Sequence, residues 1–128
     1  MTAHPTYTWD HVHIRTPDVE GMATWFAEML GGEIVRKPAM VVIQLGGGSI
    51  FLSGATDDVN PPPAIPYQGL EHIGLAVKDI DAVAASLKAK GVVFTKEPTT
   101  LRPGTRVCFL AGPLGISIEL LERDAKYT

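Results

Sequence analysis

The feature that most constrains the fold of this chain is an internal repeat of nine residues. Residues 10–18 read DHVHIRTPD, and residues 71–79, which follow 61 positions later, read EHIGLAVKD. Each copy has an acidic residue, a histidine, two apolar residues with one residue between them, and an aspartate at its end. A repeat of this kind predicts that one structural unit occurs twice in the chain.

The first copy has the alternation of a half-buried strand. Val12 and Ile14 share one parity, while His11, His13 and Arg15 share the other. Successive side chains of a strand point to opposite faces of the sheet. If the two apolar residues face the core, the two histidines and the arginine point together to the other side.

A capped helix is predicted after each copy of the repeat. Asp18 is a suitable N-cap for a helix over 19–30, because its carboxylate can accept from free N–H groups of the first turn. Asp79 plays the same part for a helix from residue 80 to about residue 90. Gly31 and Gly91 follow the two helices, and glycine readily takes the left-handed conformation that ends a helix.

Three strands are predicted after each helix, so both halves have the order β-α-β-β-β. The three glycines at 46–48 predict a hairpin turn in the first half, and a loop is predicted from Pro98 to Gly104 in the second. We expect one domain over residues 1–128, with module one at about 9–54, a proline-rich linker at 55–69 and module two at about 70–122. Each half is predicted to begin with a strand, at 9–15 in the first half and at 70–77 in the second. The predicted strands after the helices are 33–36, 40–45 and 49–53 in the first half, and 92–95, 106–110 and 116–121 in the second.

Composition argues against several classes of partner. The chain has 128 residues, 45% of them hydrophobic, and a formal net charge of −3, so we expect a single compact domain that does not bind nucleic acid. No apolar run reaches the length of about 18 residues that predicts a membrane span, so no membrane partner is expected. The single cysteine, Cys108, lies in an apolar stretch and is expected to be a buried, inert thiol. One cysteine and no leader-like N-terminal segment favour a cytoplasmic protein.

These motifs together resemble the vicinal oxygen chelate superfamily. The resemblance rests on the two β-α-β-β-β halves, the histidine early in each, and the stretch ISIELLE at residues 116–122, and it extends from Trp9 to Glu122. The superfamily includes glyoxalase I, methylmalonyl-CoA epimerase, fosfomycin-resistance proteins, extradiol dioxygenases and bleomycin-binding proteins. It implies an α+β fold in which two βαβββ modules pair their sheets into a cupped, partly open barrel around a metal site.

The resemblance also implies which residues bind the metal. In members that use one, the first strand of each module gives a histidine and the last strand gives a glutamate, and these positions fall on His11, His72 and Glu119. Nitrogen and carboxylate ligands suit a divalent ion of Fe, Mn, Ni, Co or Zn. We expect Glu119 to be catalytic through that ion. His13 is expected to be catalytic as a general base, and the alternatives are a partner of a ligand or a polar wall residue.

Two positions depart from the better-known members. Glyoxalase I and the epimerase take a fourth ligand from the last strand of module one, and the alignment of the two halves puts Phe51 at that position. Many dioxygenases and fosfomycin proteins carry a tyrosine about ten residues before the final glutamate, and Phe109 stands there. Neither phenylalanine can ligate a metal or donate a hydrogen bond.

The expected function is the first of the following three, and the other two remain open as alternatives. The first is a metal-dependent lyase or isomerase of the glyoxalase kind, which acts on a small carbonyl-containing substrate chelated to the ion. The second is an Fe(II) extradiol-type dioxygenase of a catechol, and the third is a bleomycin-resistance-like protein that binds its ligand without catalysis. A homodimer with a small-molecule substrate is expected, because most members of the superfamily are dimers.

Overall fold

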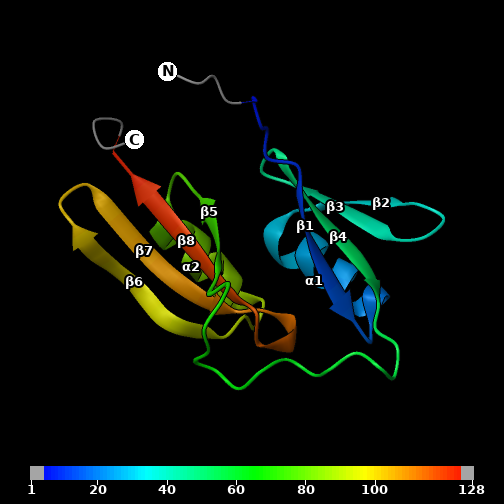
Figure 1. Cartoon of the computed structure of the whole chain (residues 1–128). Helices are drawn as coiled ribbons and strands as arrows, with labels where there is room; N and C mark the ends of the chain where they lie inside the picture. Colours follow the sequence, from blue (N-terminus) through cyan, green and yellow to red (C-terminus); the bar gives the residue numbers. More distant parts are fainter. Residues whose placement is uncertain (1–4, 125–128) are drawn as a thin grey trace. The chain divides into compact units, whose positions relative to one another are not determined.

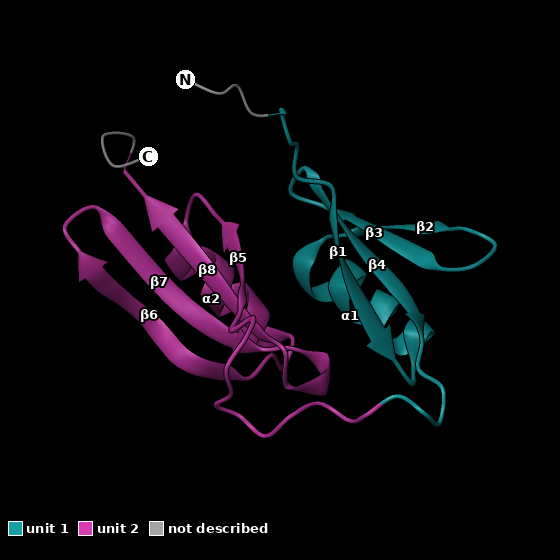
Figure 2. Ribbon diagram, in the orientation of Figure 1, with its two compact units in different colours: residues 1–59 teal, residues 60–128 magenta. Residues whose placement is uncertain are grey.

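The computed structural model describes residues 5–124 and divides into two compact units, with the boundary between Val59 and Asn60. Figure 2 colours the two units separately. Unit 1 contains β1 (His11–Thr16), α1 (Val19–Leu30), β2 (Glu33–Arg36), β3 (Val41–Leu45) and β4 (Gly48–Gly54). Unit 2 contains β5 (Ile73–Ala76), α2 (Ile80–Ala89), β6 (Phe94–Arg102), β7 (Thr105–Ala111), a short 3₁₀ turn (Pro113–Gly115) and β8 (Ser117–Arg123).

The two units have the same topology (Figure 1). Unit 1 has an open four-stranded sheet in the order β1-β4-β3-β2, and unit 2 has one in the order β5-β8-β7-β6. The first and last strands of each unit pair in parallel, and the other pairs are antiparallel. The predicted α+β fold with two βαβββ modules is therefore confirmed. The cupped pairing of the sheets, and the single domain with modules at 9–54 and 70–122, stay predictions.

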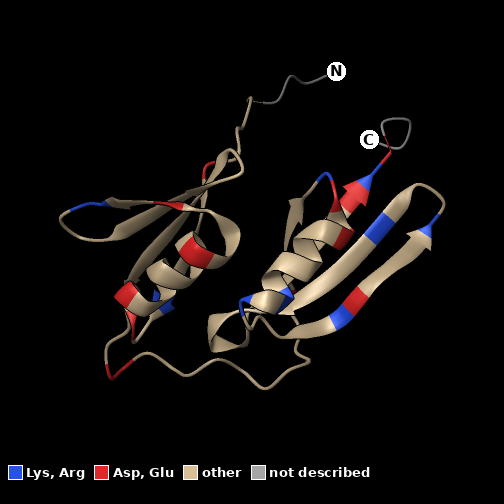
Figure 3. Ribbon diagram, turned by 180° about the vertical axis from the view of Figure 1, so that it is seen from behind, with Lys and Arg blue, Asp and Glu red and all other residues tan. Residues whose placement is uncertain are grey.

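Both helices begin at the aspartates that end the repeats. The Asp18 carboxylate accepts from the N–H of Gly21 at 2.9 Å, and the Asp79 carboxylate accepts from Ala82 at 3.2 Å. Acidic residues in the helices can be followed in Figure 3. Negative charge at a helix N-terminus satisfies free N–H groups and opposes the helix dipole. The repeat motif thus ends where its helix starts.

Each unit buries one face of its sheet under its own helix. In unit 1 the fully buried side chain of Phe26 on α1 packs in a core with Ile43 and Leu52 from the sheet. In unit 2, Ile80, Ala84 and Leu87 on α2 are buried on the side of β7 and β8 that carries Leu110, Ile118 and Leu120. We call this the helix face of each sheet, and the opposite side the outer face.

Two sequence predictions about strands in unit 2 were wrong. The stretch from Pro98 to Gly104 was expected to be a loop, but β6 continues to Arg102 and includes Pro98. Proline is tolerated there because β6 is an edge strand and its pairing with β7 has register shifts on both sides of Pro98. The strand expected from residue 70 begins only at Ile73. Over residues 5–124, neither helix is long and apolar enough to cross a membrane.

Candidate metal centre

A histidine and a glutamate lie close together on the outer face of unit 2. His72 immediately precedes β5, and Glu119 lies on β8, where it pairs with Gly74 across the parallel ladder. The His72 Nε2 and the Glu119 Oε1 are 3.8 Å apart. The side chains are 32% and 18% exposed, so a ligand can reach both while neighbouring groups shield them in part.

The orientation of His72 suits a metal ligand. Its Nδ1 lies 2.9 Å from the Glu71 carboxylate. A carboxylate at neutral pH can only accept, so Nδ1 carries the proton and Nε2 presents a lone pair in the neutral ring. Metal-ligating histidines are typically held by such a hydrogen bond from the other ring nitrogen.

The distance between the two donor atoms also fits. Ligand nitrogen and oxygen atoms lie about 2.1 Å from a bound divalent ion, so two of them can be at most about 4.2 Å apart. The 3.8 Å between His72 Nε2 and Glu119 Oε1 is within that limit. Unit 2 therefore supplies two donors that fit one divalent cation.

His11 has the equivalent arrangement in unit 1. Its Nδ1 lies 2.5 Å from the Asp10 carboxylate, which again leaves Nε2 as the nitrogen with the lone pair. Its ring stacks on Phe51, with 3.8 Å between the ring centroids and 11° between the planes. The two repeat histidines thus share one pattern, in which the preceding acidic residue orients the ring.

Phe51 occupies the position in unit 1 that Glu119 occupies in unit 2. His13 pairs with Phe51 across β1 and β4, as Gly74 pairs with Glu119 across β5 and β8. The predicted alignment of the two halves at this position is confirmed. In place of a fourth ligand, unit 1 has an apolar ring packed against His11.

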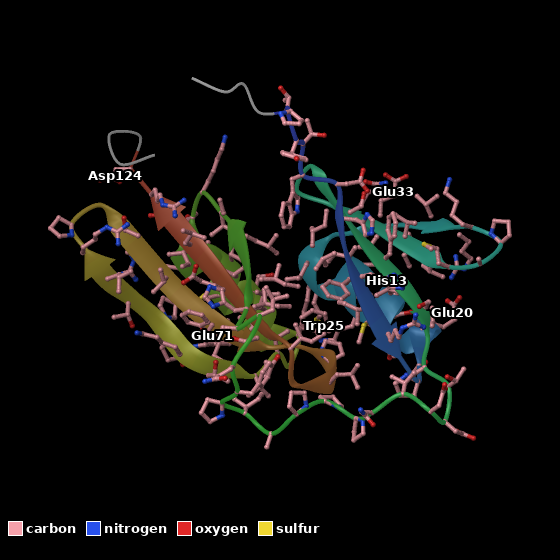
Figure 4. The ribbon with its side chains drawn as sticks, in the orientation of Figure 1. His13, Glu20, Trp25, Glu33, Glu71 and Asp124 are labelled. Carbon is pink, nitrogen blue, oxygen red and sulfur yellow. The ribbon has the colours of Figure 1, made fainter. Side chains whose placement is uncertain are left out.

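His13 lies on the outer face with His11, as the alternation predicted, and is labelled in Figure 4. Its Nε2 is 2.7 Å from the Ser53 hydroxyl, and its ring meets the Phe51 ring edge-on at 6.2 Å. This contact between His13 and Ser53 was not predicted from the sequence. The signal was present, because Ser53 lies two residues after Phe51 on the same strand face.

Arg15 is close enough to Asp58 to act on its charge. The Thr56 hydroxyl donates to the Asp58 carboxylate and is the main cause that lowers the pKa of Asp58. The N–H of Asp58 itself and the positive charge of Arg15 lower that pKa further. Arg15 therefore has an acidic neighbour within its own unit.

Arg106 and Cys108 lie away from the outer face of unit 2. Arg106 donates to Asp81 on α2 at 2.7 Å, which places its guanidinium on the helix side of the sheet. Cys108 is fully buried, which confirms its expected burial, and desolvation raises the pKa of its thiol. Phe109 stands at the position where many dioxygenases carry a tyrosine. Its ring meets the His72 ring edge-on, with 5.2 Å between the ring centroids.

Within residues 5–124, no group of three or more His, Cys, Asp or Glu side chains is arranged to hold a metal ion. His11 belongs to unit 1, whereas His72 and Glu119 belong to unit 2. Each unit alone offers part of the predicted ligand set.

Two βαβββ units with an acid-oriented histidine in each define a duplicated α+β protein with candidate metal ligands in both units. The chain belongs to the Glyoxalase/Bleomycin resistance protein/Dioxygenase superfamily, whose family model matches residues 8–120. This confirms the family that the sequence motifs indicated.

Two relatives of the chain are named as probable lactoylglutathione lyases. The Arabidopsis thaliana protein named "probable lactoylglutathione lyase, chloroplastic" is 28% identical in an alignment 124 residues long, which covers 88% of this chain and 35% of that protein. The chain thus spans about a third of that relative. The Vibrio cholerae protein named "probable lactoylglutathione lyase" is 25% identical over 88% of both chains.

Solved structures share the fold. A glyoxalase family protein from Bacillus anthracis matches with a TM-score of 0.73 at 21% identity, over 96% of this chain and 100% of that one. The lactoylglutathione lyase from Agrobacterium tumefaciens matches with a TM-score of 0.68 at 19% identity, over 93% and 96% of the two chains.

Proposed function

We propose that this protein is a metal-dependent, glyoxalase-like lyase or isomerase that acts on a small carbonyl-containing substrate. The observation that carries the proposal is the pair of His72 Nε2 and Glu119 Oε1, 3.8 Å apart, with the His72 ring oriented by Glu71. The relatives named as lactoylglutathione lyases support the same class of reaction.

The proposed metal ligands are His11, His72 and Glu119. This set combines one histidine of unit 1 with the ligand pair of unit 2, because the two histidines occupy equivalent positions of the repeat and have equivalent carboxylate partners. A divalent ion of Fe, Mn, Ni, Co or Zn would polarise a substrate carbonyl and stabilise the negative charge that develops on its oxygen. Two histidines and one carboxylate leave room for substrate oxygens.

His13 is the proposed proton-transfer group. Phe51 has no carboxylate with which to move a proton, whereas His13 lies beside it on the same face. Its Nε2 is engaged with the Ser53 hydroxyl, so Nδ1 is the atom proposed to accept a proton from the carbon next to the carbonyl and to return it. In this proposal Ser53 holds the ring in place while Nδ1 works.

Metal analysis tests the ligand set. The chain, purified without added metal and then loaded, is expected to hold one equivalent per chain, and His11→Ala, His72→Ala and Glu119→Ala are each expected to lose it. Glu97→Ala is a matched control, because Glu97 is an exposed carboxylate of unit 2 that pairs with Lys88. Unchanged metal content in all three ligand variants would show that the assignment is wrong.

Activity separates the three functions. Isomerisation of the hemithioacetal of methylglyoxal and glutathione by the loaded protein, lost in His13→Ala, is expected for the proposed reaction. Oxygen uptake with catechols under Fe(II) would instead favour the dioxygenase. A protein that binds ligand, holds no metal and turns over nothing would be a binding protein. Sedimentation measures whether the chain forms the expected homodimer.

A further inference from the structure

Gly74 is an unusual residue for its place in the fold. It lies inside β5 on the outer face, directly opposite Glu119 in the ladder. Its backbone is not among the glycines with positive φ, so the conformation does not require glycine. Glycine inside a strand weakens it and often marks a place where a ligand or another group approaches closely.

The space above Gly74 borders the candidate ligand pair. A Cβ built at Gly74 would lie 3.6 Å from Glu119 Oε1 and 3.9 Å from Leu121 Cδ2. Both are ordinary van der Waals contacts, so one methyl group fits there, whereas a longer or branched side chain would extend over the carboxylate. The same Glu119 oxygen lies 3.8 Å from His72 Nε2. A side chain at position 74 would therefore occupy space next to the Glu119 carboxylate, which is one of the two proposed donors of unit 2.

The repeat shows how the two units differ at this place. Unit 1 has His13 at the position of Gly74. The next ladder pair on the outer face of unit 1 is Arg15 with Ser53. The corresponding pair in unit 2 is Ala76 with Leu121. Ala76 is exposed and Leu121 is half-buried. The ladder pair after His13 in unit 1 is therefore polar, whereas the ladder pair after Gly74 and Glu119 in unit 2 is apolar and partly exposed.

We propose that Gly74 determines substrate specificity, because it leaves room beside Glu119, next to Ala76 and Leu121, for an apolar substituent of the substrate. The inference rests on the proposed function, in which Glu119 lies at the reacting centre. The substrate class is a carbonyl compound with an alkyl or aryl group on the carbon next to the reacting one. The alkyl or aryl group binds on the surface beside Ala76 and Leu121. The size of the group that fits there is limited by the side chain at position 74.

Selectivity among 2-oxoaldehydes tests the inference. The glutathione hemithioacetals of glyoxal, methylglyoxal and phenylglyoxal differ only in that substituent. Gly74→Val is expected to lower kcat/KM for the phenyl substrate relative to the glyoxal substrate by about 10- to 200-fold, the usual cost of a steric misfit of this size. Gly74→Ala should change this ratio by no more than about threefold, because its methyl group fits.

A binding measurement gives a readout that does not depend on turnover. Acetohydroxamate and benzohydroxamate bind metals through the same two oxygens and differ in the size of the apolar group. In calorimetric titrations of the metal-loaded protein, Gly74→Val is expected to weaken benzohydroxamate by more than about tenfold relative to acetohydroxamate. Metal content, measured in parallel, should stay at the wild-type level.

Two further variants keep the test decisive. Gly54→Val is the matched control, because Gly54 ends β4 and a Cβ there meets nothing within 4 Å; it should leave both ratios unchanged. Ala76→Leu, which narrows the same space from an exposed strand position, replaces Gly74→Val if that variant does not fold. If the wild type binds both hydroxamates and the ratio of their affinities does not change in the Gly74 and Ala76 variants, this inference is overturned while the proposed function stands. Failure of the wild type to bind metal or either hydroxamate would overturn the proposed function and the inference with it.

Discussion

Removal of the carboxylates that orient the two repeat histidines should weaken metal binding without removing any ligand. Glu71→Ala deletes the acceptor 2.9 Å from His72 Nδ1, and Asp10→Ala deletes the one 2.5 Å from His11 Nδ1. Without its partner each ring can rotate or change tautomer, and its Nε2 becomes a weaker base. Affinity for the ion should therefore fall.

The expected size of the loss follows from exposure and distance. Partners of metal-ligating histidines typically contribute about 10- to 100-fold to metal affinity. Both carboxylates are 80% exposed, so solvent and salt screen them and the low end applies. We expect Glu71→Ala to weaken binding about tenfold, or about 1.4 kcal/mol, and Asp10→Ala somewhat more because its contact is shorter.

The measurement is a competition titration of Zn²⁺ or Co²⁺ against a chromophoric chelator, at low and at high salt. The difference from wild type should shrink at high salt, because the interaction is electrostatic and exposed. Glu97→Ala should bind like wild type, and His72→Ala with Glu71→Ala should be no worse than His72→Ala alone. Wild-type affinity in both single variants, at low salt, would refute the idea that the duplicated acid–histidine pair serves the ligands.

Four more predictions concern stability, thiol reactivity and the pH dependence of unfolding. Phe26→Ala removes a fully buried ring from the core of unit 1 and should lower the free energy of unfolding in urea by about 3–5 kcal/mol; a loss below about 1 kcal/mol would contradict the assigned core. Asp79→Ala removes the cap of α2 and should cost about 1 kcal/mol in the same assay, and Asp79→Asn, which can still accept, should restore most of it. Cys108 should react with a thiol reagent only as fast as the protein unfolds, and fast labelling under native conditions would show that it is not buried. Since burial raises the pKa of that thiol, its neutral form is favoured in the folded state, and unfolding should become easier as the pH rises above the ordinary thiol pKa.

Much of this fold could be predicted from the sequence because its signals are local. The alternation around Val12 and Ile14 reflects the two faces of a strand, and Asp18 and Asp79 cap the helices through contacts only three residues away. The alignment of the two halves was enough to show that Phe51 occupies the position in unit 1 that is equivalent to Glu119 in unit 2. Each of these inferences depends on neighbours in the chain or on the repeat itself.

Tertiary structure alone decided which side chains across strands become partners. The pairing of His13 with Ser53 joins residues 40 positions apart, and Arg106 turned out to face the helix and pair with Asp81. Pro98 could be accommodated in a strand only because β6 is an edge. Sheet register and edge position are properties of the whole unit, since they depend on how strands distant in the sequence align. The nine-residue repeat by itself determined that two histidines are oriented alike, and the folded sheets determined that one of them lies beside a glutamate and the other beside a phenylalanine.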